Sequence, residues 1–294
     1  MFQGLISLTI YKLKNTNFKY IMKIPNTIFV KHCPNLSPER KTFLIKYLEE
    51  KVPIKDVRWE EDYNHTHLFV NWINNKLKLP YGLKLTSNMI KTIMSWKTMI
   101  EENIESAIFM DDDVVFHKDW VSIFESIPDI DQDCFLNLGI SPFYDIKPEY
   151  GKVHQLHNNA GCEAMWMSLT FVKKIMKNLN IHHACDIVLH GYLYSINKPV
   201  LCVPICHQTS MVMRSTSLEH ESRDTIHWIT YIQKYSELPK LNFDEIFKEY
   251  EILKEKKEKL ENKFYEIYGK KIDMKQIEYI ERSGEYNVNI LNFN

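Results

Sequence analysis

The sequence has few glycines and prolines, no long apolar run and no excess of charge of one sign. Among its 294 residues there are only 8 glycines and 11 prolines, which excludes collagen-like and linker-like chains. No apolar run approaches the roughly 20 residues that a membrane-spanning helix needs. Basic and acidic residues number 37 and 38, so the chain lacks the positive excess by which bulk charge holds a nucleic acid. We therefore expect neither a transmembrane segment nor a nucleic-acid partner.

Cysteine is also scarce, with six residues scattered through apolar surroundings. This distribution favours buried free thiols in a reducing compartment over a disulfide scaffold. The apolar stretch 2–11 has no basic residue before it and no clear cleavage site, so it is a poor signal peptide. We predict a soluble protein of the cytoplasm.

Hydrophobic residues, by contrast, make up 45% of the chain and aromatic residues 13%, enough for a sizeable core. Between about 27 and 204, short apolar runs alternate with helical patterns, which predicts an α/β sheet flanked by helices. We expect an N-terminal extension at 1–21, because Met22 would start the folded domain equally well. The α/β domain should then cover 22–239, and a C-terminal helical segment should cover 240–294.

Strands and helices can be predicted within the α/β domain. Ser37 is expected to cap a helix that has Pro38 in its first position. Its apolar face should consist of Phe43, Leu44, Tyr47 and Leu48. A second amphipathic helix should begin after Thr86 or Ser87. Runs of β-branched, aromatic or other apolar residues predict strands at 27–30, 57–59, 107–110, 134–139 and 200–203.

The segment 243–268 is rich in lysine and glutamate, and its apolar residues recur at spacings of three, four and seven. This pattern predicts a long helix. An amphipathic helix packed on its own domain is one interpretation, and a short pairing helix that makes a homo-oligomer is the other. Lys257 interrupts the apolar seam, which speaks against a long coiled coil.

The most informative stretch is 107–116, an apolar run that ends abruptly in three aspartates and then resumes. It predicts a buried strand that presents Asp111, Asp112 and Asp113 at the carboxyl edge of the sheet, where open α/β sheets bind ligands. Alternation along an extended backbone would place Asp111 and Asp113 on one side and Asp112 on the other. A merely solvated acidic turn is the competing interpretation.

Carboxylates this close repel one another, and a hard divalent cation would relieve the repulsion. Mn²⁺ or Mg²⁺ prefers such oxygen ligands and would bridge them to a substrate diphosphate. A nucleoside-diphosphate leaving group needs that neutralisation when its bond to a sugar breaks. We expect Asp111 and Asp113 to hold the metal and the donor diphosphate, with Asp112 near the ribose or behind the metal ligands.

The order of motifs resembles glycosyltransferase family 25, which contains bacterial lipooligosaccharide galactosyltransferases and collagen galactosyltransferases. The resemblance covers roughly 28–215, and its acidic motif is the specific part. It implies a GT-A fold, a nucleotide-sugar donor and an inverting transfer assisted by a divalent metal. The segments similar to the family's motifs are Asn35-Leu36-Ser37-Pro38-Glu39-Arg40-Lys41, Leu85-Thr86-Ser87 through Ser95-Trp96, Met110-Asp111-Asp112-Asp113-Val114-Val115-Phe116, Ala160-Gly161-Cys162-Glu163-Ala164-Met165-Trp166, and Cys185-Asp186.

The resemblance also suggests further site residues. GT-A enzymes seat the nucleotide after the first strand, which makes Ser37 and Arg40 candidates for donor binding; a helix cap and a solvated arginine are the alternative. Inverting transfer needs a general base, and Glu163 and Asp186 lie in matching segments, although Asp186 could equally cap a helix. Many GT-A enzymes take a third metal ligand from a late histidine, here His207, with a loop histidine as the alternative.

The combined interpretation is a hexosyltransferase that uses Mn²⁺ or Mg²⁺ and a nucleotide-diphosphate sugar, expected to be UDP-linked. Its acceptor would be a hydroxyl of a glycan, a lipid-linked molecule or a protein. Two alternatives stay open: an inactive relative that binds a sugar nucleotide or glycan, and a structural protein assembled through 243–268. Metal-dependent donor hydrolysis would distinguish the enzyme from an inactive binding relative. A thermal shift with Mn²⁺ and nucleoside diphosphates would distinguish a nucleotide-binding protein from a purely structural one.

Overall fold

The computed structural model describes residues 21–79, 81–139, 149, 151–156, 161, 163–209 and 233–268. Of the predicted N-terminal extension, 1–21, only Ile21 falls within these ranges, where it forms an isolated bridge with Pro128. The chain divides into two compact units, residues 1–241 and residues 242–294.

The first unit is built on a mixed sheet flanked by helices, which confirms the predicted α/β class. All five predicted strands are present. The strands are β1 (Thr27–Lys31), β2 (Asp56–Glu60), β3 (Ser106–Asp111), β4 (Val114–Phe116), β5 (Leu136–Gly139), β6 (His154–Leu156), β7 (Ala164–Ser168) and β8 (Val200–Gln208). The helices are α1 (Pro38–Lys51), α2 (Leu68–Leu77), α3 (Leu83–Glu101), α4 (Trp120–Ser126), α5 (Leu169–Lys177) and α6 (Cys185–Ser195), with a 3-10 helix η2 (Tyr235–Glu237).

The strands lie in the order β2-β1-β3-β7-β5-β8-β4, with β6 beside β8. β1 pairs in parallel with both β2 and β3, so three carboxyl ends meet at one edge of the sheet. β7 runs antiparallel to β3 and β5, whereas β5 and β8 are parallel. The register of β8 shifts against β5, and its last residues pair with β4, which follows directly after the aspartates. The long strand β8 therefore returns to the acidic motif.

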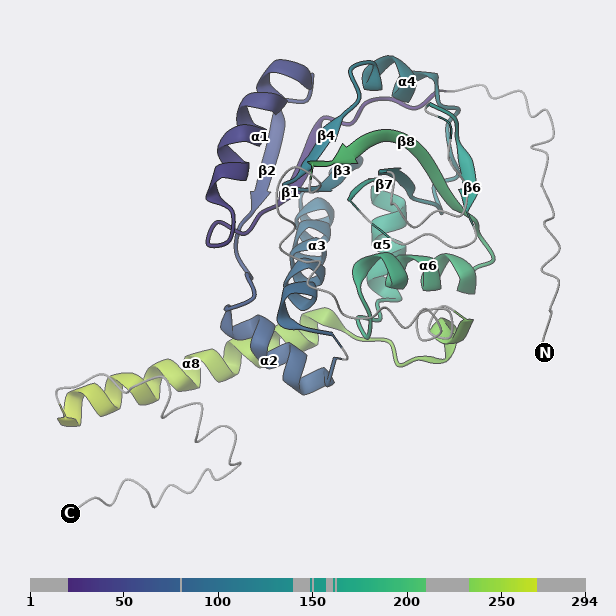
Figure 1. Cartoon of the computed structure of the whole chain (residues 1–294). Helices are drawn as coiled ribbons and strands as arrows, with labels where there is room; N and C mark the ends of the chain where they lie inside the picture. Colours follow the sequence, from purple (N-terminus) through teal and green to yellow (C-terminus); the bar gives the residue numbers. More distant parts are fainter. Residues whose placement is uncertain are drawn as a thin grey trace, which may run out of the picture. The chain divides into compact units, whose positions relative to one another are not determined.

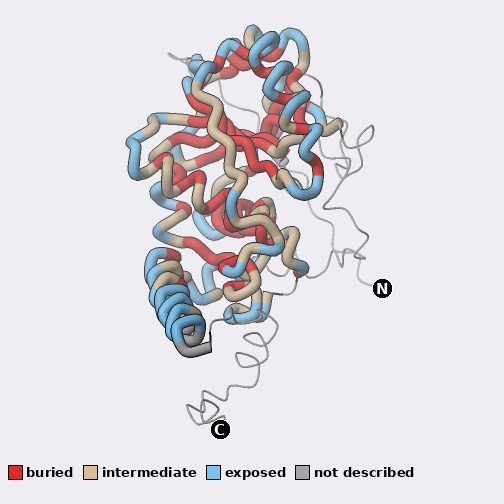
Figure 2. Tube along the Cα trace, turned by 90° about the vertical axis from the view of Figure 1, so that its left-hand side faces the viewer, coloured by how far each residue is buried: buried red, intermediate tan, exposed pale blue. Residues whose placement is uncertain are grey.

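Helices cover both faces of the sheet (Figure 1). α3, α5 and α6 lie on one side, and α3 contacts β1, β2 and β3. Figure 2 shows the central strands buried between these layers. On the other face α1 and α4 share one apolar cluster with the strands, to which the helices contribute Leu44, Leu48, Trp120 and Phe124, and β1 and β3 contribute Ile28, Val30, Ile108 and Met110.

The start of α1 is as predicted, and its predicted apolar face is confirmed for Leu44, Tyr47 and Leu48 but not for Phe43. The helix begins at Pro38 with Ser37 in the N-cap position, although the Ser37 side chain makes no capping hydrogen bond. Phe43, expected on the buried face, is 45% exposed. Arg40 is buried in the helix instead. Arg40, Leu44 and Leu48 recur every four residues and form the buried face of α1, and Phe43 lies outside that face.

The predicted start of the next long helix is wrong. α3 begins at Leu83, so Thr86 and Ser87 lie inside the helix and are buried. Each hydroxyl has a tertiary partner in place of a capping role. The Asn74 amide donates to Thr86 Oγ1 at 2.8 Å, and Ser87 Oγ donates to the carbonyl of Tyr63 at 2.7 Å.

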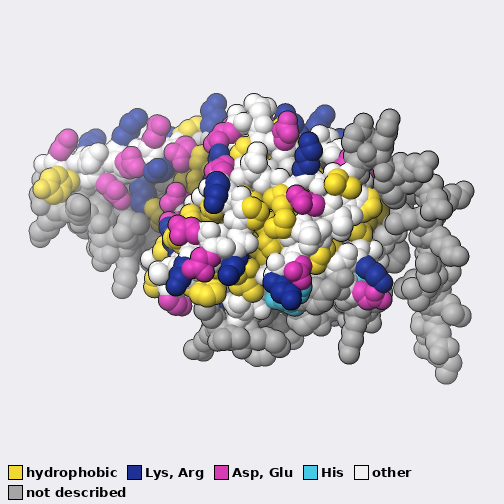
Figure 3. Space-filling model, turned by 90° about the horizontal axis from the view of Figure 1, so that it is seen from above, with side chains coloured by type: hydrophobic (Ala, Val, Ile, Leu, Met, Phe, Trp, Pro, Cys, Tyr) yellow, Lys and Arg dark blue, Asp and Glu magenta, His cyan; other side chains and the backbone are white. Residues whose placement is uncertain are grey.

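The second unit contains α8 (Phe243–Tyr268), which confirms the predicted C-terminal helix at both ends. Over the described part of the face shown in Figure 3, basic and acidic side chains are interspersed, in keeping with the balanced composition. The five cysteines within the described ranges are free, and four of them are buried. Among the described helices, none is long and apolar enough to cross a membrane.

Candidate functional site

The acidic motif lies at the edge of the sheet where β1, β2 and β3 end. β3 ends at Asp111, the next two aspartates form a turn, and β4 begins at Val114. The four residues of β3 before Asp111, from Ala107 to Met110, are buried and apolar, so the strand becomes polar again only at the sheet edge. Because β1 is the parallel neighbour of β3, Lys31 stands opposite Asp111 in the register. The predicted strand and its edge position are confirmed.

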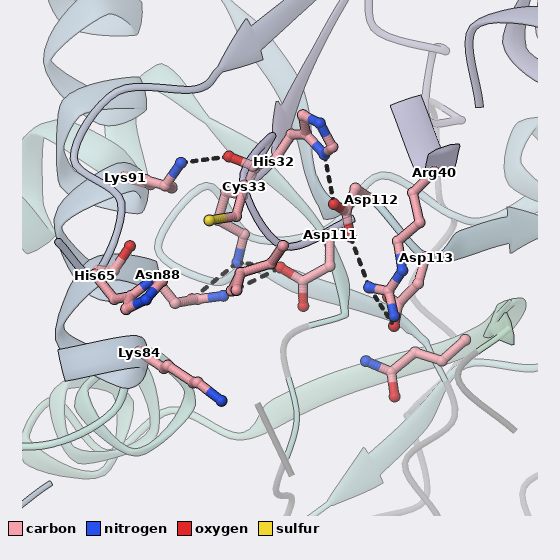
Figure 4. Close-up of a pocket in the computed structure, with 14 residues that line it drawn as sticks. His32, Cys33, Arg40, His65, Lys84, Asn88, Lys91, Asp111, Asp112 and Asp113 are labelled. Carbon is pink, nitrogen blue, oxygen red and sulfur yellow. Dashed lines mark hydrogen bonds and ion pairs between the residues drawn. The ribbon is translucent and has the colours of Figure 1, made fainter. Parts of the chain in front are cut away.

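A pocket opens at this edge, and all three aspartates line it (Figure 4). Its walls come from the end of β1 and the loop after it, from α1, from α3 and from the last residue of β8. Carboxylates and cations therefore face one space, which suits a ligand that combines anionic groups with a metal ion. The basic residues that line the pocket are Lys31, His32, Arg40, His65, Lys84 and Lys91.

Asp111 is held by one lysine and one amide. Lys31 Nζ lies 2.9 Å from Asp111 Oδ1, and the Asn88 amide donates to the same oxygen at 3.2 Å. Lys31 also donates to Asn88 Oδ1 at 3.1 Å. These contacts connect the ends of β1 and β3 to α3.

Asp112 is the most firmly paired of the three aspartates. His32 Nδ1 lies 2.6 Å from its Oδ2, and Arg40 Nη1 donates to its Oδ1 at 3.0 Å (Figure 4). The same Arg40 nitrogen is 3.6 Å from Asp113 Oδ2. The expected alternation of the aspartates is therefore wrong, because a turn replaces the extended backbone that it assumed. The alternative of a solvated Arg40 is also wrong, since this side chain is only 4% exposed.

Asp113 is buried with one uncompensated oxygen. Its Oδ1 has no hydrogen-bond partner within the described ranges. Burial, and next the negative charge of Asp111, raise the pKa of Asp113 to about 7, while Arg40 opposes that rise. A carboxylate in this setting favours a proton or a metal ion as its partner. The interpretation of the motif as a merely solvated turn does not fit a buried Asp113.

Lys91 of α3 ties two strand ends together. Its ammonium donates to the carbonyl oxygen of His32 and, at 3.1 Å, to that of Glu60. Burial lowers the pKa of Lys91 and raises the pKa of Glu60 to about 7. Lys91 thus fixes the wall of the pocket through backbone carbonyls.

Glu163 lies directly behind the acidic motif, because its backbone carbonyl accepts the Asp111 amide at 2.8 Å. Its buried side chain packs against two glycines: a Cβ added to Gly161 or Gly139 would lie 2.5 Å or 2.9 Å from its carboxylate oxygens. Among the described residues, Oε2 has no hydrogen-bond partner. Burial, and next the charge of Asp111, raise the pKa of Glu163 to about 7.

Asp186 lies in the first turn of α6, and backbone amides occupy both of its oxygens. Oδ2 accepts the amide of Gly161 at 2.8 Å, and Oδ1 accepts the amide of Ile187 at 2.9 Å. The second contact satisfies an amide of the first helical turn, although the N-cap residue of α6 is Ala184 and not Asp186. Gly161 contacts Asp186 and would clash with Glu163 if it carried a Cβ, so the two candidate bases flank one glycine.

Four of the predicted site residues do not line the pocket: the candidate bases Glu163 and Asp186, which lie behind it, and His207 and Ser37. His207 is an exposed residue of β8 that pairs with Val115. Its neighbour Gln208 lines the pocket instead, because successive strand residues point to opposite sides. Ser37 is buried, and the pocket is lined by Arg40 of the same segment.

Sequence reasoning missed several residues that contact the aspartates or line the pocket. A signal for Lys31 and His32 was present in the sequence, because they directly follow the predicted first strand, 27–30. The carboxyl-edge rule applied to the aspartates therefore covers them too. Asn88 and Lys91 are polar residues three apart on a largely buried helix. That spacing places the two side chains on the same side of the helix, but it does not show which part of the protein this side contacts.

His190 is a buried titratable residue away from the pocket. It stacks on Phe135 with 6.4 Å between ring centroids, and within the described ranges neither ring nitrogen has a hydrogen-bond partner. Burial lowers its pKa from 6.5 to about 4, against an opposing effect of Asp186. The folded protein therefore holds this imidazole neutral.

We expect His190 to make the protein less stable in mild acid. Between pH 6.5 and about 4 the unfolded chain binds a proton that folded His190 does not, so the free energy of unfolding should fall by about 3 kcal/mol over this interval. His190→Leu should remove that part of the pH dependence, whereas His154→Gln should leave it. Urea unfolding at a series of pH values measures both, and an unchanged slope in His190→Leu would contradict the prediction.

The chain shows little detectable similarity to known proteins. No protein-family model matches the chain, and no curated protein matches its sequence. Among solved structures, the chain is similar to the crystal structure of a glycosyltransferase involved in the glycosylation of the major capsid of PBCV-1. The TM-score is 0.35 and the sequence identity 10%, over 72% of this chain and 98% of that one. A likeness at this level does not establish a shared activity.

Proposed function

We propose that the chain is a GT-A-like glycosyltransferase, related to family 25, that moves a sugar from a nucleoside-diphosphate sugar to an acceptor hydroxyl. The observation that carries this proposal is the pocket at the carboxyl ends of β1 and β3, where three aspartates meet lysine and arginine side chains. A diphosphate is bound well by such cations, and a dication held on carboxylates can bridge to it.

For the metal we propose Asp111 and Asp113 as the protein ligands of Mn²⁺ or Mg²⁺. Asp113 fits because its buried Oδ1 has no partner among the described residues. Asp111 fits because its side-chain contacts within the described ranges, from Lys31 and Asn88, both go to Oδ1, so an ion could bind Oδ2. Within the described ranges no three His, Cys, Asp or Glu side chains could hold a metal by themselves, but Mg²⁺ commonly uses one or two carboxylates with substrate phosphates and water. A bound ion would neutralise charge on the departing diphosphate.

For the general base we propose Glu163 in preference to Asp186. Both oxygens of Asp186 accept backbone amides, whereas Glu163 Oε2 has no partner among the described residues. A base needs a free lone pair toward the proton that it takes. Close packing against Gly139 and Gly161 holds the Glu163 side chain in place, which is the order that such a base requires.

In the proposed transfer, the acceptor oxygen attacks the anomeric carbon while the bond from that carbon to the diphosphate oxygen breaks. The hydroxyl proton passes to Glu163, and the electron pair of the broken bond leaves with the nucleoside diphosphate. Attack opposite the leaving group inverts the configuration at the anomeric carbon. Lys31 and Arg40 line the pocket in which the charge of the leaving group would grow.

Ligand-induced stabilisation tests the proposal directly. A ligand that binds only the folded state raises the unfolding midpoint, so Mn²⁺ together with UDP or GDP should raise it more than either component. Mn²⁺ with CMP, which has no diphosphate, serves as the control. Donor hydrolysis by the same preparation, measured with and without EDTA, then separates an enzyme from an inactive binding relative. No shift with any nucleoside diphosphate would overturn the proposal.

Substitution of Glu163 should separate chemistry from donor binding. Glu163→Gln keeps the size of the side chain but cannot take a proton, so we expect transfer to fall about 100-fold or more with nucleotide binding unchanged. Asp186→Asn, the matched carboxylate variant, should lose less than about tenfold. Steady-state transfer rates and calorimetric nucleotide titrations measure the two effects. A larger loss in Asp186→Asn would transfer the role of base to Asp186.

A further inference from the structure

The side chain of Lys31 forms an ion pair with Asp111, one of the proposed metal ligands. Lys31 Nζ lies 2.9 Å from Asp111 Oδ1, and the Lys31 side chain is 4% exposed. Asn88 completes a ring of contacts: its carbonyl oxygen accepts from Lys31 at 3.1 Å, and its amide donates to Asp111 Oδ1 at 3.2 Å. The pairing of β1 with β3 holds the backbones of Lys31 and Asp111 side by side.

Lys31 differs from two other cations of the pocket in what it contacts. Arg40 is shared by Asp112 and Asp113, and Lys91 donates to backbone carbonyls. Lys31 contacts Asp111 and the amide that also supports Asp111. Its ammonium is a compact charge on a flexible stem, so it can change partner through side-chain rotation. If it did so, the Asn88 amide would remain on Asp111 Oδ1.

A dication on Asp111 would bring two positive charges close together. Coulomb repulsion between the ion and the Lys31 ammonium opposes binding of the ion unless an anion joins them or the ammonium moves. A diphosphate supplies that anion, because its oxygens can accept the metal and an ammonium at once. Arrival of the diphosphate would therefore turn Lys31 from a competitor of the metal into a ligand of the phosphate.

We propose that Lys31 makes binding of the metal depend on binding of a nucleoside diphosphate, because its positive charge stays beside Asp111 until the diphosphate accepts its ammonium. This inference rests on the proposed function, because it requires a metal and a diphosphate in the same pocket. The coupling is reciprocal: each ligand raises the affinity of the other by the same factor. The full-length protein should bind free Mn²⁺ weakly and the metal with nucleotide tightly.

The test compares Lys31→Met with the wild-type chain by isothermal titration calorimetry, using Mn²⁺ alone and then UDP or GDP at saturating Mn²⁺. In Lys31→Met, free Mn²⁺ should bind about tenfold more tightly and the nucleoside diphosphate about tenfold more weakly. Opposite changes are the signature of the proposal, since a merely structural role for Lys31 would weaken both. Lys31→Arg keeps the charge and should retain the coupling.

The control is Lys41→Met, which makes the same substitution at a lysine 2.8 Å from Glu61 and should alter neither titration. Thermal unfolding without ligand checks that each variant folds, and Lys31→Gln replaces Lys31→Met if the latter does not. Changes of the same sign in both titrations, unchanged coupling, or failure of both variants to fold would overturn the role of Lys31. If the wild-type chain binds neither Mn²⁺ nor nucleotide, the proposed function fails, and this inference fails with it.

Discussion

Replacing Asp112 by alanine is expected to lower the free energy of unfolding by about 3 kcal/mol. The substitution leaves Arg40 and His32 without their main carboxylate, and both of those side chains are almost fully buried. Breaking a buried ion pair by removing one partner costs about 3–5 kcal/mol, because an uncompensated charge stays behind. Chemical denaturation monitored by circular dichroism measures the change.

A matched control exists on the same sheet. Asp56 pairs with Arg58 at 3.0 Å, but the Asp56 side chain is 42% exposed. Asp56→Ala should therefore cost only about 1 kcal/mol, as is usual for solvent-screened pairs. Equal losses in the two variants would show that Asp112 acts as an ordinary surface carboxylate and that the network with Arg40 and His32 contributes nothing extra.

Asp113→Asn should have the opposite effect on stability and a much larger effect on activity. The asparagine keeps the shape of the side chain but cannot supply the anionic ligand, so metal-dependent transfer should fall about 100-fold or more. Without ligands the variant should be at least as stable as the wild-type chain. It no longer buries a charge beside Asp111.

The pH dependence supplies a check on this reasoning. The pKa of Asp113 is raised from 3.8 to about 7, so the folded state holds its proton more tightly than the unfolded state. The wild-type chain should therefore lose stability as pH rises through this interval, and Asp113→Asn should lose less. Urea unfolding at pH 4.5 and at about pH 8 tests this, with Asp129→Asn as the control. A variant that retains metal-dependent activity would contradict the metal assignment.

The elements that could be predicted are those with strong local patterns. The apolar runs at β1 and β3 end in charged residues, and the apolar residues of α8 recur at helical spacing over most of its length, so the approximate bounds of these elements follow from the sequence. The start of α3 could not be predicted in the same way. Thr86 and Ser87 are good capping residues, but hydrogen bonds to Asn74 and Tyr63 retain them inside the helix. Long-range partners overrode the local preference.

A buried strand that presents three aspartates at a sheet edge can be predicted from the sequence, because hydrophobic patterning and strand polarity are local properties. The cations that face these aspartates are known only from the fold. Asp112 meets His32 and Arg40 across 80 and 72 residues of chain, and Lys31 meets Asn88 across 57. Ion pairs of this kind depend on strand order and helix placement, and no local period specifies these. The sequence therefore indicated a carboxylate site, and the fold made it a site of paired charges.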